Sequence, residues 1–345
     1  MVGIGIGDRM VDRVQGLLAE RDRISNYGDS YTPDPYDDDY DNYDQDVWED
    51  DQPDEDLEPT AEPTPLQPLG VQTRPNGVQY HPRTVAGQFE DVALLRSART
   101  EGEHVLFYGP PGTGKSALAE AAFARDATAE HDGIESIVGT ADTTEADFVG
   151  SFVPDSAAPS GFSWRPGPLH RSVLHNIPLL VDEIALIDPR VLSVLYALMD
   201  GRGVLRITAN PDLEPLPIGD NWFVIGAYNP HVIGANLSEA LRDRFTHHIE
   251  IGTDWQLAGE LGVPADIIGV AKSLDAKREA GEIAWSPQLR SLLSYARTVE
   301  LRGRDYALAN LLAKAPVDDR DTVAAALTDE FGTVAPLRLG RRYAS

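Results

Sequence analysis

The sequence contains no cysteine, so disulfide bonds, thiolate metal sites and cysteine nucleophiles are excluded. It has no run of about 18 consecutive apolar residues, and no transmembrane helix is expected. The first ten residues lack the basic region and the long apolar region of a secretory signal. These absences predict a protein without a membrane segment and are compatible with a reducing cytoplasm, which is the expected location.

Basic residues are scarce, because 29 Lys and Arg stand against 56 Asp and Glu, for a formal net charge of -27. Much of the imbalance is local: the stretch from Asp29 to Glu62 has many carboxylates and no Lys or Arg. A surface that binds nucleic-acid phosphates is usually basic. The charge balance therefore disfavours a nucleic-acid ligand.

The first 83 residues are predicted to hold little regular structure. Within residues 1–24, Val11, Val14 and Leu18 recur at helical spacing, which indicates a short amphipathic helix or a frayed terminus. Residues 25–83 are rich in Asp, Tyr and Pro, and this composition predicts disorder. The interleaved aromatic residues could contact a basic partner, although a solubilising tail is the simpler interpretation.

The sequence pattern changes at residue 84, and residues 84–252 are predicted to form an α/β domain. Amphipathic helical patterns alternate with short apolar runs. This alternation is typical of a parallel sheet with helices on both faces. The expected strands cover residues 104–108, 134–139, 178–181, 222–227 and 247–251. Residues 253–345 show helical patterns almost throughout and are predicted to form a separate helical domain and tail.

A glycine-rich loop between the first strand and a helix fits the pattern G-x-x-x-x-G-K-[ST]. Such a loop directs backbone N–H groups at phosphates, and the following helix adds its positive end. Lys115 is predicted to reach the β- and γ-phosphates of ATP, and the Ser116 hydroxyl to bind Mg²⁺. A turn that matches by chance is the alternative. The predicted nucleotide-binding residues are Gly109, Pro110, Pro111, Gly112, Thr113, Gly114, Lys115, Ser116 and Ala117.

Two acids end the apolar run at residues 178–181. Ligands of open α/β sheets bind at the carboxyl ends of the strands. We therefore predict that Asp182 helps to hold Mg²⁺ and that Glu183 is the general base for the attacking water. A helix N-cap could also explain an acid at this place.

Further polar residues follow the next strand. Asn229 stands at its end and is predicted to sense the γ-phosphate or the attacking water, although an Asn before a proline also forms turns. Arg244 is the first candidate for an arginine that acts on a neighbouring subunit's nucleotide, and Arg242 is the second. Either arginine could instead form a surface salt bridge. Arg290, in the first turn of a helix, could reach the nucleotide or simply be solvated.

Ordered motifs over residues 85–315 resemble the MoxR/CbbQ-like branch of the AAA+ ATPases, a dynein-related group with an insert in the second helix. The motifs are VAGQFEDVALLRSA, GPPGTGKS, ADFVGSF, WRPGPLHRSV, PLLVDEIALIDPRVLSVLYALMDGRGV, FVIGAYNP and LSEALRDRF. The glycine loop alone would identify only a P-loop ATPase. The PGPL element before the VDE strand, followed by NP and ALRDRF, is more specific.

The resemblance implies a P-loop NTPase with an AAA+ core at residues 84–252 and a helical lid within 253–345. It implies a homohexameric ring with nucleotide between subunits, Asn229 as sensor and Arg244 as the finger acting in trans. Arg290 corresponds to the second sensor less securely, because Gln288 stands where some members carry arginine. The resemblance also implies a β-hairpin at about residues 150–166. In this family the hairpin faces the ring axis or a partner, so Phe162, Trp164 and residues 147–150 would be contact residues there, or simply pack the hairpin.

Members of this family usually remodel client proteins, often with a partner that contains a von Willebrand factor A domain. The leading hypothesis is therefore a Mg²⁺-dependent ATPase that remodels a client protein with such a partner. A nucleic-acid-stimulated motor is the first alternative, since related insert-bearing ATPases act on nucleic acid. A nucleotide-gated scaffold with little turnover is the second.

Overall fold

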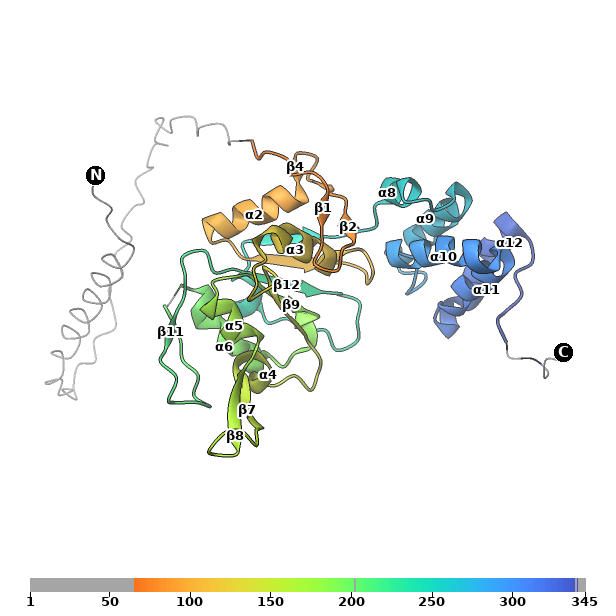
Figure 1. Ribbon diagram of the computed structural model, residues 1–345. Coiled ribbons are helices and arrows are strands. Elements are labelled where there is room, and N and C mark those ends of the chain that lie inside the picture. The colour runs from red at the N-terminus through yellow and green to blue at the C-terminus, as the bar shows by residue number, and fades with distance from the viewer. Residues whose placement is uncertain (1–64, 202, 339, 341–345) are drawn as a thin grey trace, which may run out of the picture. The chain divides into compact units, whose positions relative to one another are not determined.

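The computed structural model describes residues 65–201, 203–338 and 340 (Figure 1). The helix predicted within residues 1–24 and the disorder predicted up to residue 64 lie outside the described residues. Among the residues described, no helix is long and apolar enough to cross a membrane.

A five-stranded parallel sheet forms the centre of the core, in the order β13-β5-β12-β9-β6. Each strand lies within one residue or two of a strand expected from the sequence, so the predicted α/β class is confirmed. The strands are β5 (Val105–Tyr108), β6 (Glu135–Val138), β9 (Leu179–Asp182), β12 (Val224–Tyr228) and β13 (His247–Glu250).

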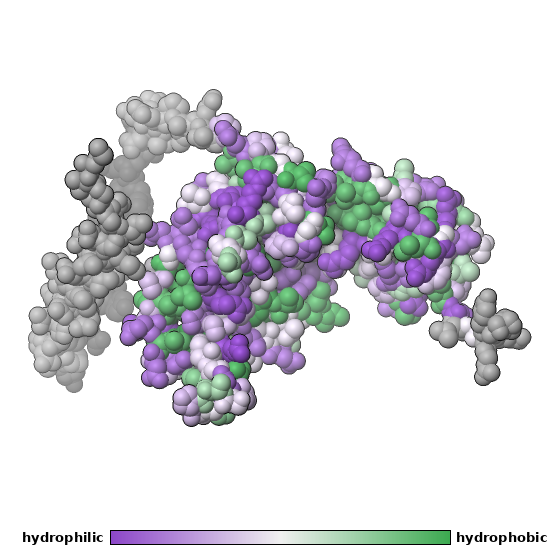
Figure 2. Space-filling view, viewed as in Figure 1, coloured by the Kyte–Doolittle hydropathy of each residue, from purple (hydrophilic) through white to green (hydrophobic). Residues whose placement is uncertain are grey.

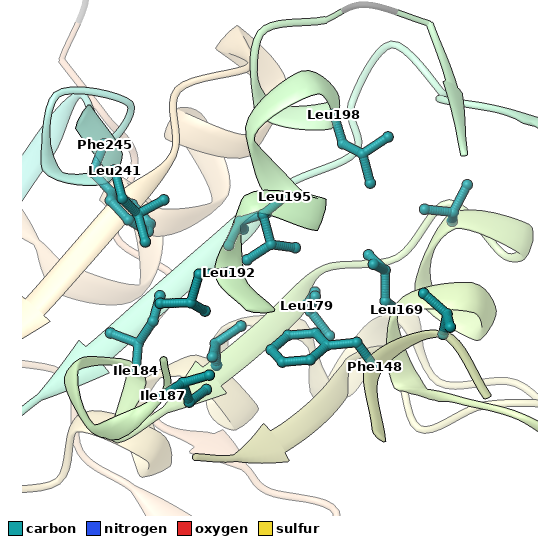
Figure 3. Packing of buried hydrophobic residues seen from close by; sticks show 14 of the residues in the cluster. Phe148, Leu169, Leu179, Ile184, Ile187, Leu192, Leu195, Leu198, Leu241 and Phe245 are labelled. Carbon is teal, nitrogen blue, oxygen red and sulfur yellow. The ribbon is translucent and has the colours of Figure 1, made fainter. Parts of the chain in front are cut away.

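Helices cover both faces of this sheet (Figure 1). Successive side chains of a strand point to opposite faces, so Leu106 packs in one apolar cluster while Val105 and Phe107 pack in another. The second cluster includes α2 (Asp91–Glu101) and α3 (Lys115–Phe123). The first includes α4 (Glu145–Val149), α5 (Pro168–Leu174) and α6 (Pro189–Met199), with Phe148 and Leu169 among its buried residues (Figure 3).

Helix α6 shows how local sequence sets an element. Its N-cap Asp188 accepts a hydrogen bond from the Arg190 N–H, and Pro189 occupies the first turn, where its missing N–H costs little. Leu192, Leu195 and Leu198 then recur at helical spacing and are buried against the sheet (Figure 3). The helix follows directly on the acidic end of β9 through a 3-10 turn, η2 (Ile184–Leu186).

The predicted start of the core at residue 84 is wrong. Residues 65–83 were expected to be disordered, yet β1 (Gln72–Thr73) and β2 (Gln79–Tyr80) form an antiparallel hairpin. The Tyr80 side chain is buried, and its hydroxyl donates to Asp91 Oδ2 at 2.5 Å. Because proline and polar residues together make up most of this segment, composition gave no sign that one tyrosine anchors it to the core.

Two longer hairpins extend the core. The hairpin expected at residues 150–166 is confirmed as β7 (Gly150–Pro154) paired with β8 (Phe162–Pro166), between α4 and α5. It projects from the core in Figure 1. The second, β10 (Val204–Leu205) paired with β11 (Leu216–Pro217), was not predicted. A shorter pair joins β3 (Thr84–Val85) to β4 (Phe89–Glu90).

After β13 the chain is helical, as predicted, and these helices share an apolar cluster of their own. Buried residues of that cluster include Ile267, Leu292 and Leu308. The helices are α8 (Trp255–Glu260), α9 (Ala265–Glu279), α10 (Leu289–Arg302), α11 (Arg304–Ala313) and α12 (Arg320–Phe331). Shorter elements are α7 (Glu239–Arg242), η1 (Ala124–Asp126) and η3 (Val317–Asp319).

Candidate functional site

The glycine loop runs from the end of β5 to the start of α3, as its sequence context predicted. Its conformation needs glycine, because Gly109, Gly112 and Gly114 all have positive φ, at 138°, 83° and 99°. At Gly109 a Cβ would also overlap the carbonyl oxygen of Ile251. The loop therefore closes against the residue that follows β13, next to the N-terminus of α3, where backbone N–H groups are available for an anion.

Lys115 is the first residue of α3 and is almost fully buried. Its ammonium donates to the carbonyl oxygens of Gly109 at 2.8 Å and Pro110 at 2.9 Å. Burial lowers the pKa of Lys115, while the carboxylates of Glu183 and Asp182 oppose that shift. The ammonium thus lies inside the loop, close to both acids that the sequence placed at the strand end.

Ser116 and Asp182, the two residues predicted to hold Mg²⁺, are in direct contact. The Ser116 hydroxyl donates to Asp182 Oδ2 at 2.5 Å across the space between α3 and β9. No group of three or more His, Asp or Glu that could hold a metal occurs in the described part of the chain. A hydroxyl and one carboxylate fit Mg²⁺, which typically keeps water and phosphate oxygens as its other ligands.

Glu183 has a left-handed backbone, with φ 52° and ψ 37°, which a non-glycine residue rarely adopts. Burial raises the pKa of its carboxyl group and Asp182 raises it further, while Lys115 and the Asn229 N–H oppose the shift. A carboxylate with a raised pKa is a better proton acceptor. The geometry is therefore suited to a general base, although the role itself stays a prediction.

Asn229 directly follows β12 and is buried. Its N–H acts to lower the pKa of the Glu183 carboxyl group, and its Oδ1 accepts from the His231 N–H at 3.1 Å. The turn expected as the alternative role of Asn229 is thus present. The Nδ2 group forms no hydrogen bond within the described residues, so the predicted sensor role is still open to it.

The two candidate arginines differ sharply. Arg244 forms a bidentate pair with Asp200, at 2.8 and 3.0 Å, and stacks on Tyr196 at 4.6 Å from the ring centre. These contacts raise the pKa of Arg244, with the Asp200 hydrogen bond as the main cause. Arg242 is exposed, and its side chain has no hydrogen bond or ion pair among the described residues. In this chain alone, Arg244 forms the salt bridge named as its alternative role.

Arg290 lies beside the glycine loop. Its backbone N–H donates to the Gly112 carbonyl oxygen at 3.1 Å, and its Cβ lies 3.0 Å from where a Cβ on Gly112 would stand. Its side chain is exposed. The tertiary structure thus brings a residue 178 positions from Gly112 onto the loop, and its role towards nucleotide stays a prediction.

The structure contains a cavity of about 580 Å³ of which the sequence gave no indication. Its walls come from residues 83–86, 248–254, Asp91 and Leu118. Arg83 is one of them and donates to the carbonyl oxygens of Thr113 and Gly252 at 3.1 and 3.2 Å. A lone Arg before the predicted core carries no motif, so only the fold could reveal this contact.

Comparisons with known proteins identify a family match within the core. Residues 104–245 match the model of a family described as "AAA domain (dynein-related subfamily)". A stretch of 252 residues is 28% identical to the Holliday junction branch migration complex subunit RuvB of Chloroflexus aurantiacus, covering 70% of this chain and 62% of that protein. The chain thus spans less than two thirds of that relative's length.

Two further matches are less informative. A stretch of 162 residues is 28% identical to the uncharacterized protein YojN of Bacillus subtilis, covering 45% of this chain and 51% of that protein. Among solved structures, NtrX from Brucella abortus matches with a TM-score of 0.42 and 15% identity, over 69% of this chain and 62% of the other. A score this low supports no statement about function.

Proposed function

We propose a function from one premise: the chain carries an AAA domain of the dynein-related subfamily and is an ATP-hydrolysing enzyme. The proposal is that Mg²⁺-dependent ATP hydrolysis in a homohexameric ring remodels a client protein, as in the MoxR/CbbQ-like branch. A partner with a von Willebrand factor A domain is part of the proposal and follows from that resemblance alone. Because the chain is an ATPase, we do not carry the scaffold alternative further.

The chemistry follows from the placement of the residues. The loop N–H groups and Lys115 bind the phosphates, and Lys115 exchanges its carbonyl contacts for phosphate oxygens. Ser116 and Asp182 would hold Mg²⁺, which neutralises charge that develops on the phosphates. Glu183 accepts a proton from the attacking water. The cavity beside residues 83–86 would take the base and sugar.

One observation supports a polypeptide client, namely the surface of the β7–β8 hairpin. Phe152 and Phe162 are 51% and 53% exposed, and Phe152 contacts Trp164 edge to face at 5.2 Å between ring centres. Residues 150–166 carry one acid and one base, Asp155 and Arg165. In Figure 2 the projecting hairpin is mostly pale rather than strongly hydrophilic. Exposed aromatic rings without a basic cluster fit a polypeptide better than a phosphodiester backbone.

Stimulation of the ATPase by a permanently unfolded polypeptide tests the client. We expect the wild type to be stimulated, and the double variant Phe152→Ala/Phe162→Ala to lose most of that stimulation. Leu301→Ala is the matched control, because Leu301 is also exposed but lies on α10. Equal stimulation of the wild type and the hairpin variant would refute the role of the hairpin.

The site assignment and the assembly need separate tests. Lys115→Ala and Glu183→Gln should both lose turnover, and undiminished turnover in both would refute the site. Light scattering after gel filtration, with and without ATP, measures the number of subunits in the assembly, and six are expected. Affinity capture with Glu183→Gln, which should hold ATP without hydrolysing it, tests for the von Willebrand factor A-type partner.

A nucleic-acid motor is the second candidate, because the chain is similar to a Holliday junction branch migration complex subunit. The formal net charge of -27 and the hairpin surface disfavour it. Stimulation by DNA that weakens steeply with salt would favour this candidate over the remodelling proposal. Absence of DNA binding at low salt would eliminate it.

A further inference from the structure

Gln288 stands where some members of the resembling branch carry an arginine that reads the nucleotide, but in this structure it cannot do so. The residue is 5% exposed, and both polar atoms of its side chain are occupied. Its Oε1 accepts from the Thr253 hydroxyl at 2.7 Å, and its Nε2 donates to Asp275 Oδ1 at 2.8 Å and Ser286 Oγ at 2.7 Å. No donor of this side chain remains for a phosphate.

These bonds connect the cavity wall to the helical region. Thr253 follows β13 and lines the cavity, while Asp275 lies on α9. Asp275 Oδ1 also accepts from Arg278 Nε at 2.9 Å and from Ser286 Oγ at 2.6 Å. Burial acts to raise the pKa of Asp275, but these hydrogen bonds prevail and lower it, so the acceptor stays ionised.

The same bonds fix the first turn of α10. Gln288 is the N-cap of that helix, and the Leu289 N–H donates to the Thr253 hydroxyl at 3.2 Å. The next N–H, that of Arg290, donates to the Gly112 carbonyl oxygen. The start of α10 is therefore held to the cavity wall on one side and to the glycine loop on the other. This geometry fixes the backbone of Arg290, from which its exposed side chain extends.

We propose that Gln288 is a positioning residue, which joins Asp275 to Thr253 and thereby holds Arg290 over the glycine loop. It acts on nucleotide through Arg290 and does not contact it. The proposal rests on the nucleotide site of the proposed function, and it deepens that site by naming the residue that sets Arg290.

Nucleotide titration of single variants is the first test. Gln288→Met keeps the length and the burial of the side chain but removes both polar ends. Loss of hydrogen bonds of this kind should weaken ADP binding by about threefold to tenfold. Thr253→Val should weaken ADP binding to a similar extent. Thr253→Ser should bind ADP as the wild type does, since serine keeps the hydroxyl. Gln256→Met is the control, because Gln256 is an exposed glutamine on α8.

A double-variant cycle separates positioning from general damage. If Gln288 acts through Arg290, then Gln288→Met should change ADP binding less than about twofold in an Arg290→Ala background. An undiminished effect in that background would overturn the proposal, as would wild-type binding by Gln288→Met. Urea denaturation checks that each variant is folded. Failure of the wild type to bind ADP would instead refute the nucleotide site, so the two failures are distinguishable.

Discussion

Replacing Gly139 with alanine should slow ATP hydrolysis while leaving nucleotide binding intact. Gly139 follows β6, and its N–H donates to the Asp182 carbonyl oxygen at 2.7 Å. A Cβ there would lie 2.5 Å from Ile187 Cγ1 and 2.7 Å from the Glu183 carbonyl oxygen. Ile187 is fully buried and cannot swing into solvent, so the backbone at Glu183 must move.

The size of the effect follows from that overlap. Ordinary contact begins at 3.4 Å, so the Glu183 carbonyl must retreat by roughly 0.7 Å. A displacement of about 1 Å can cost on the order of 100-fold in rate, so kcat should fall by about tenfold or more. This corresponds to about 1.4 kcal/mol in the barrier. Overpacking should also lower the free energy of unfolding by about 1–3 kcal/mol.

Steady-state ATPase kinetics and nucleotide titration measure the two effects separately. Binding should stay near the wild-type value, because the atoms nearest to the added Cβ belong to Ile187 and Glu183 and not to the glycine loop. Gly269→Ala is the matched control: apart from its chain neighbours and the backbone of its own helix, no atom lies within 4 Å of its added Cβ, and kcat should not change. A folded Gly139→Ala variant with wild-type kcat would refute the idea that the position of Glu183 limits the reaction.

Three further predictions concern titration, anchoring and assembly. Because the general base must be ionised and burial raises the pKa of Glu183, kcat should fall as pH drops through a value above the ordinary 4.5. A kcat–pH profile in which the fall of kcat at low pH has its midpoint at or below pH 4.5 would contradict the assignment of Glu183 as the general base. Tyr80→Phe should lower the free energy of unfolding in urea by about 1–2 kcal/mol, because the buried Asp91 loses a donor; an unchanged midpoint would show that the hairpin is not anchored there. Arg244→Ala should abolish turnover but not nucleotide binding if Arg244 acts in trans. If it only pairs with Asp200, turnover should persist and stability should fall.

The three central strands of the core, β5, β12 and β9, were readable from the sequence because they are buried on both faces. Such strands form apolar runs, which stand out between amphipathic helices. The β7–β8 hairpin was reached through resemblance, since its own residues carry no distinctive period. The hairpin at residues 72–80 was missed because it is held by one buried tyrosine and by ion pairs such as Arg74–Glu120, at 2.6 Å. Composition does not report such contacts.

By itself the sequence determined where the glycine loop and the acids at the end of β9 lie, because local geometry dictates which residue types can stand there. Glycine must supply positive φ, and a strand end must carry the carboxylates. Tertiary structure alone decided what faces these groups: that Arg290 lies on Gly112, that Gln288 is buried and fully bonded, and that Arg244 is paired with Asp200. Each of these contacts joins residues far apart in the chain, and no pattern along one segment records them.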